Sequence, residues 1–200
     1  LLMSLPSAVG LYFLSGPIIY ILFEHGAFLS NDTLFTASTL SMFTLGLPAY
    51  ILIKVLVTCF FAREDTKTPL YVSIISVLAN IILSLILIQS MREMGIALAT
   101  AISAWLNAFL LYVILKIRNN IALDSRLISH SFKTIICTVV MGFACYFLNL
   151  TFFSHMTNHT TIANIGALIL TIMLCIIIYI AAIFMLKVLT INELRKYIKK

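Results

Sequence analysis

The stretch KVLVTCFFAREDTKTP, residues 54–69, decides how this chain folds. It opens with Lys54, continues through apolar residues and then a charged cluster, and closes at Pro69. Long apolar runs lie before and after it, as in a chain that crosses a membrane repeatedly. A cation inside an apolar helix and a short charged turn are therefore the two features that need a functional explanation.

Composition indicates an integral membrane protein. Of the 200 residues, 62% are hydrophobic and 10% are charged, and the mean hydropathy is +1.12. A soluble domain carries about 25% charged residues, so this chain lacks the polar surface that water requires. The net charge of +6 is not gathered on one soluble face. It therefore argues against a nucleic-acid partner and favours basic loops on the cytoplasmic side of a membrane.

Apolar runs predict an all-α fold with six membrane-spanning helices. The predicted spans are 5–23, 36–61, 70–89, 96–115, 132–153 and 162–188. Pro17 should kink the first span, and Gly46 with Pro48 should bend the second. Residues 119–131 are predicted to form a cytoplasmic linker, and the chain ends in a basic tail. Because the chain begins at Leu1 without a charged leader, we expect it to be the C-terminal part of a longer protein.

The basic residues predict the orientation. Of the 13 lysines and arginines, eleven fall on one side of the predicted spans, Arg92 falls on the other, and Lys54 lies within a span. The cytoplasmic side carries the excess of such residues. The C-terminus and the turn holding Arg63, Asp65 and Lys67 are therefore predicted to be cytoplasmic. This turn is either a gate or salt-bridged turn, or a solvated loop that only fixes topology.

Lys54 is the leading candidate for contact with a substrate. It lies roughly 12 Å from the cytoplasmic end of its span by helical rise, where a lysine costs about 2.5–3.5 kcal/mol on insertion scales. Spacing of four places Lys54 on one helix face with Gly46, Tyr50 and Thr58. Such a polar stripe suits the wall of a water-filled cavity. The alternative is a lysine that reaches the interface along its own apolar stem.

Two polar stripes follow in the next two spans. One comprises Ser73, Ser76, Asn80 and Ser84, and the other Thr100, Ser103 and Asn107. Helix packing through small and hydrogen-bonding residues is one interpretation. The other is a cation site built from amide and hydroxyl oxygens, although neither span contains a carboxylate. The last two spans carry no charge within the membrane, which suits packing or a groove for an apolar tail.

Nothing in the sequence indicates an enzyme. The four histidines lie in loops or at span ends, and no HExxH, GxSxG or phosphate-binding loop occurs. The four cysteines lie in apolar runs without a CxxC pair, so they are predicted to be packing residues rather than metal ligands. Glu64 and Asp65 are the only adjacent acidic pair, which is thin support for a metal-dependent transferase acting on polyprenyl phosphate.

Three segments carry a resemblance to a known family. LPSAVGLYFLSGPIIYILFEHGAF (residues 5–28), LGLPAYILIKVLVTCFFAREDTKTP (residues 45–69) and GIALATAISAWLNAFLLY (residues 95–112) resemble the MurJ (MviN) family of lipid II flippases. The resemblance implies the last six helices of a fourteen-helix MATE-like fold of the MOP superfamily. Residues 1–118 would then supply four helices of the second transporter lobe, and residues 132–200 the terminal helix pair and tail.

The resemblance also implies a function. The family moves the undecaprenyl-linked peptidoglycan precursor, lipid II, from the inner to the outer leaflet of the bacterial cytoplasmic membrane for cell-wall synthesis. Expected partners are this lipid, membrane lipids and the N-terminal lobe of the same protein.

Lys54 and Arg63 match the family string, and Thr58 stands where many members have proline. Asn80, Ser84 and Thr100 match a sodium site, with serine replacing a carboxylate. Sodium or the membrane potential would supply energy, and no other cofactor is expected. A MATE-like exporter of drugs or polysaccharide-linked lipids is the alternative.

Overall fold

The computed structural model describes residues 2–26, 28–118, 125–153 and 161–186. These residues form helices and no strand. The helices are α1 (Ser4–Phe23), α2 (Ser30–Thr44), α3 (Leu47–Phe61), α4 (Lys67–Met91), α5 (Glu93–Ile117), α6 (Ser125–Phe153) and α7 (Thr161–Met185). Six candidate membrane spans occur among them, because α2 and α3 together make one, Ser30–Phe61. The predicted all-α class with six spans is confirmed, and the chain is a multi-pass membrane protein.

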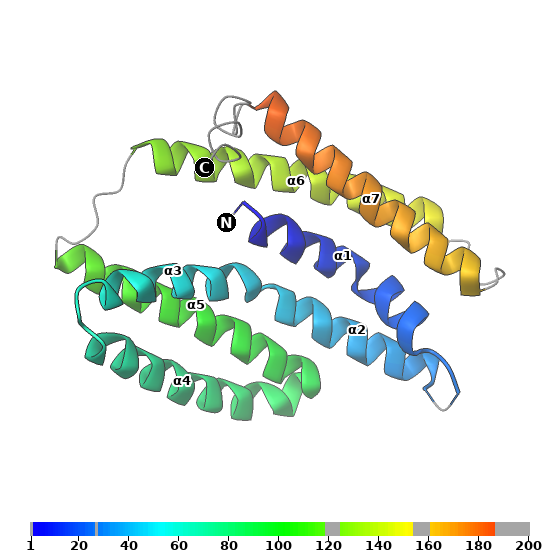
Figure 1. Cartoon of the computed structure of the whole chain (residues 1–200). Helices are drawn as coiled ribbons and strands as arrows, with labels where there is room; N and C mark the ends of the chain where they lie inside the picture. Colours follow the sequence, from blue (N-terminus) through cyan, green and yellow to red (C-terminus); the bar gives the residue numbers. More distant parts are fainter. Residues whose placement is uncertain (1, 27, 119–124, 154–160, 187–200) are drawn as a thin grey trace.

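Helix α1 lies between two groups of helices (Figure 1). On one side of it the antiparallel pair α6 and α7 packs, and on the other side lie α2 and α3, which pack on α5. Helices α4 and α5 form a hairpin farther from α1. One core cluster joins α1 to α6 and α7 and includes Leu14, Met141 and three buried cysteines. A second joins α3, α4 and α5 around Phe60 and Leu111. Of the segment 119–131, predicted as a linker, residues 119–124 fall outside the described residues, and residues 125–131 form the first part of helix α6 instead.

The bend predicted in the second span is a break between two helices. Pro48 stands at the start of α3, where its missing N–H interrupts the hydrogen-bond ladder. Gly46 lets α5 approach closely, since a Cβ built on it would lie 3.1 Å from the Ala101 Cα. At the same place the Trp105 indole Nε1 donates a hydrogen bond to the Leu45 carbonyl oxygen at 2.9 Å. The break therefore serves as a contact point between this span and α5.

The hairpin between α4 and α5 is tightly closed. Arg92 connects the helices with φ of 51°, a conformation that side chains other than glycine seldom adopt. Gly95 in the first turn of α5 contacts the backbone of Leu87 in α4. Beyond it, buried alanines at 97, 99, 101, 104 and 108 give α5 a surface against which its neighbours can lie closely.

Candidate functional site

Lys54 lies near the middle of α3 and lines a pocket between α3 and the start of α1. The pocket of about 600 Å³ is lined by Leu47, Tyr50, Ile51 and Lys54 of α3 and by Leu2, Met3, Ser4 and Ser7. Lys54 is exposed and Tyr50 is half-buried. Among the described residues, no hydrogen bond or ion pair engages Lys54. Its ammonium group is thus open to an anionic group that enters this pocket.

Thr58 has a different place. It lies one turn beyond Lys54 on α3 and is exposed, but it does not line the pocket. Its hydroxyl donates to the Val55 carbonyl oxygen of its own helix at 2.7 Å. The structure therefore brings Lys54 and Tyr50 together in one pocket and leaves Thr58 outside it.

A larger apolar groove lies on the other side of the start of α1. Its volume is about 720 Å³, and its walls come from α1 and α7, with Met141 of α6. Aliphatic side chains dominate the lining; Ser7, Cys175 and Tyr179 are the residues with a polar atom. A groove of this kind can hold hydrocarbon but offers no charge to a polar headgroup.

The pocket and the groove share part of their lining. Leu2, Met3 and Ser7 contribute to both. The pocket presents an ammonium group and the groove presents aliphatic side chains. The two together therefore suit an amphipathic molecule with an anionic head. An anionic group brought into low dielectric requires such a counter-charge.

The turn between α3 and α4 is built by two capping arrangements. Helix α3 ends in a Schellman motif: the Asp65 N–H donates to the Phe60 carbonyl at 3.1 Å and the Glu64 N–H to the Phe61 carbonyl at 3.0 Å. Glu64 takes the left-handed position with φ of 59°, where glycine is usual. The Asp65 carboxylate then accepts the backbone N–H of Thr68, in the first turn of α4, at 3.0 Å.

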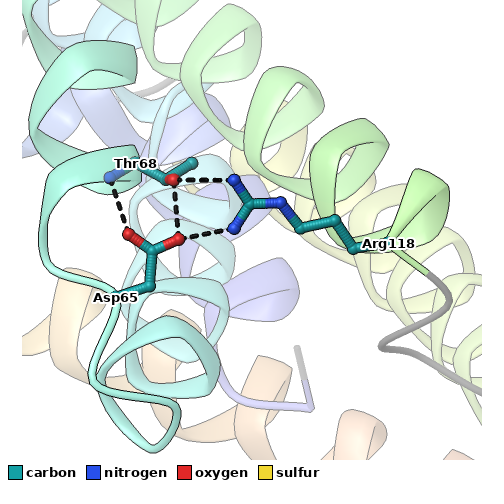
Figure 2. A network of polar contacts seen from close by, with 3 residues as sticks. All are labelled: Asp65, Thr68 and Arg118. Carbon is teal, nitrogen blue, oxygen red and sulfur yellow. Dashed lines mark hydrogen bonds and ion pairs between the residues drawn. The ribbon is translucent and has the colours of Figure 1, made fainter.

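Asp65 also joins this turn to the end of α5 (Figure 2). Its Oδ2 accepts the Thr68 hydroxyl at 2.7 Å and forms an ion pair with Arg118 at 2.5 Å, and Arg118 donates to the Thr68 Oγ1 at 3.3 Å. The side chains of Arg118 and Asp65 are 48% and 23% exposed. The hydrogen bonds from Thr68, followed by that from Arg118, lower the pKa of the Asp65 carboxyl from its usual 3.8 to about 2. Three helix ends are thereby held together.

The other two residues predicted in this turn lie outside that network. Arg63 is exposed just after α3, and Lys67 is the exposed first residue of α4. The cation that pairs with Asp65 is Arg118, from a helix end 53 residues away. A role of Arg63 and Lys67 in a gate stays a prediction.

The predicted cation site consists of neutral oxygens. The Ser84 hydroxyl donates to the Asn80 Oδ1 at 3.2 Å within α4. The Thr100 hydroxyl donates to the Ile96 carbonyl oxygen of its own helix, α5, at 2.8 Å. Oxygens of this kind can ligate a hard cation, but none of the three residues supplies the carboxylate that the resemblance led us to compare. Sodium binding here stays a prediction.

Several residues at these contacts were missed by the sequence reasoning. Thr68 and Arg118 belong to the turn, Trp105 binds the helix break, and Asn149 and Tyr179 join α6 and α7 to α1. The Asp65–Thr68 bond could have been found, because an aspartate just before an apolar helix tends to accept a backbone N–H of the first turn. The others make contacts between helices far apart in sequence, and no local pattern signals these.

Comparison with known proteins decides the family. A family model described as "Lipid II flippase MurJ" matches residues 1–166. The chain belongs to the MurJ family. A probable lipid II flippase MurJ of Rhizobium tropici is 36% identical over all of this chain and 38% of its own length. The corresponding protein of Rickettsia prowazekii (strain Madrid E) is 33% identical over 98% of this chain and 39% of its own length.

A solved structure supports the same assignment. The chain resembles a lipid II flippase MurJ in an inward closed conformation with a TM-score of 0.71 and 32% identity, covering 90% of this chain and 35% of that one. The chain thus spans less than two fifths of the length of these MurJ relatives. The helices around Lys54 and the Asp65 turn lie within the part that the family model matches.

Proposed function

We propose that this chain forms the C-terminal part of a flippase that moves lipid II, the undecaprenyl-linked peptidoglycan precursor, from the inner to the outer leaflet of the bacterial cytoplasmic membrane. Membership of the MurJ family supports this proposal. The observation that carries it is the pocket that contains Lys54 next to the apolar groove, with Leu2, Met3 and Ser7 common to both. The role is transport rather than catalysis.

Each part of the lipid has a suitable place. The pyrophosphate would lie in the pocket near the Lys54 ammonium, where charge attraction compensates for lost hydration. The polyprenyl tail would follow the groove between α1 and α7. Helices of the N-terminal lobe of the same protein would close the pocket, and rocking of the two lobes would expose it to either side in turn.

The Asp65–Arg118 contact belongs to the proposed cytoplasmic side. The basic residues of the α3–α4 turn and of the α5 end support this orientation and a cytoplasmic C-terminus. By joining the ends of α3, α4 and α5, the contact would make these helices move as one body when the lobes rock. The membrane potential, or sodium if another segment supplies a carboxylate, would drive the cycle.

Replacement of Lys54 tests the proposal. The full-length gene product with Lys54→Ala should reach the membrane at the normal level but fail to support growth of a flippase-depleted strain. Lys54→Arg keeps the charge and should retain part of the activity. Lys116→Ala is the matched control, since Lys116 is an exposed lysine at the end of α5 away from the pocket. Normal growth and normal lipid II flipping with Lys54→Ala would remove this residue from the mechanism.

A further inference from the structure

Side chains of the terminal helices bind two backbone carbonyls at α1. The Asn149 Nδ2 of α6 donates to the Phe13 carbonyl oxygen at 2.7 Å. The Tyr179 hydroxyl of α7 donates to the carbonyl oxygen of Leu2, just before α1 begins. The partners are 136 and 177 residues apart in sequence. These bonds therefore attach the helix pair α6–α7 to the first helix of the chain.

The Phe13 carbonyl stands four residues before a proline. In a helix the carbonyl of residue i accepts the N–H of residue i+4, and proline has no N–H. Pro17, which lies inside α1, therefore cannot serve Phe13. Inside a membrane no water is at hand to replace the missing donor, so an unserved carbonyl is costly. The amide of Asn149 replaces that donor, and the hydroxyl of Tyr179 serves the Leu2 carbonyl, which precedes the helix.

We propose that Asn149 and Tyr179 are positioning residues that latch α6 and α7 onto α1, Asn149 at the carbonyl freed by Pro17 and Tyr179 at the Leu2 carbonyl just before the helix. The Tyr179 contact lies in the groove lining, because Leu2 belongs to the wall on the α1 side and Tyr179 to the α7 wall. The latch thus sets the distance between the walls. It also makes α6 and α7 follow α1 when α1 moves.

The latch needs hydrogen-bond donors and not merely side chains of the right size. Tyr179 is 8% exposed and packs in the core cluster with Leu14 and Met141. A phenylalanine there would keep the packing and lose the donor. At position 149 a leucine has similar volume and no donor. In both cases the carbonyl on α1 would be left without a partner, which costs more than the bond itself contributes.

The test removes the Asn149 donor with and without Pro17. In the full-length gene product reconstituted in lipid nanodiscs, Asn149→Leu should lower the Tm by about 1–3 °C. Pro17→Ala restores an N–H that can serve the Phe13 carbonyl. In the Pro17→Ala background, Asn149→Leu should therefore lower the Tm by no more than half as much. Packing alone predicts no such recovery, because the shape of residue 149 changes equally in both backgrounds.

A control and a second variant make the test selective. Thr151→Val removes a hydroxyl that donates only within α6, to the Phe147 and Leu148 carbonyls, so Pro17→Ala should not alter its effect. Tyr179→Phe, which deletes one oxygen, should also lower the Tm, and Pro17→Ala should not alter that loss because the Leu2 carbonyl does not depend on Pro17. If Asn149→Leu fails to accumulate, Asn149→Ala removes the same donor and decides the matter.

The outcomes separate the latch from the function. Equal Tm losses from removal of the Asn149 donor with and without Pro17 would overturn the latch whatever the protein transports. The role of the latch in transport rests on the proposed function: Asn149→Leu should slow lipid II flipping several-fold, and Pro17→Ala should recover part of the rate. If Pro17→Ala reduces the Tm loss caused by Asn149→Leu, but Asn149→Leu leaves the rate of lipid II flipping unchanged, the positioning role is refuted. The effect of Lys54→Ala on flipping tests the proposed function separately.

Discussion

The contact of Gly95 with α4 allows a quantitative prediction about the helix hairpin. A Cβ built on Gly95 would lie 2.5 Å from the Leu87 carbonyl oxygen, 2.6 Å from its carbonyl carbon and 2.9 Å from its Cβ. Ordinary van der Waals contact begins at 3.4 Å, so the closest contact is 0.9 Å too short. Two of these atoms are backbone and cannot rotate away. Gly95→Ala must therefore push α4 and α5 apart.

The expected cost follows from two opposing effects. In a helix, alanine is more favourable than glycine by about 0.8–1 kcal/mol. Overpacking costs about 1–3 kcal/mol, and more when backbone must move. A gap of about 0.5–1 Å also forfeits a quarter to a half of each dispersion contact along the seam. The net expectation is a loss of about 1–3 kcal/mol in the free energy of unfolding.

Gly166→Ala is the matched control within α7. A Cβ built on Gly166 meets nothing within 4 Å, so this change should be neutral or stabilise by up to about 1 kcal/mol. Gly46→Ala should fall between the two, because its Cβ would lie 3.1 Å from the Ala101 Cα. The measurement is thermal unfolding of the full-length protein in nanodiscs. Equal stabilities of Gly95→Ala and Gly166→Ala would refute the close packing of α4 on α5.

Three further predictions concern the turn and the helix break. Asp65→Asn should lower the Tm at neutral pH. Because the pKa of the Asp65 carboxyl is lowered from 3.8 to about 2, its contribution to stability is complete above pH 3.8 and is lost as the pH falls towards 2. The Tm values of the two proteins, measured across this pH range, should therefore converge at about pH 2. Glu64→Gly should raise the Tm by relieving the positive φ of 59°; an unchanged or lower Tm would contradict the Schellman geometry. Trp105→Phe should cost about 0.5–1.5 kcal/mol in thermal unfolding through loss of the bond to the Leu45 carbonyl, and no loss would contradict that bond.

The sequence predicted the elements of the fold better than their contacts. Apolar runs located all six spans, and Pro48 with Gly46 predicted the interruption that appears between α2 and α3. Lys54 and Tyr50 share a pocket, as spacing of four on one helix suggested. These signals are local, because hydropathy, proline and helical spacing act within one helix.

The partners of the polar residues could not be predicted in the same way. Asp65 was expected beside Arg63 and Lys67, its neighbours in sequence, yet its cation is Arg118. Only the packing of α5 against α3 and α4 brings that residue within reach. The groove likewise depends on α1 lying against α7, and nothing in either helix alone indicates that pairing.

The prolines offer a physical route from sequence to those pairings. Lipid tails are as apolar as leucine, so burial of apolar surface does not choose which membrane helices associate. A carbonyl that lacks its helical donor does favour one neighbouring helix over another, because only a neighbour with a hydrogen-bond donor can satisfy it. Pro17 creates such a carbonyl for Asn149, and Trp105 binds at the break next to Pro48. A proline within one span and a lone amide, phenol or indole in another are thus candidates for contact, because the freed carbonyl and the donor each lack a partner within their own helix.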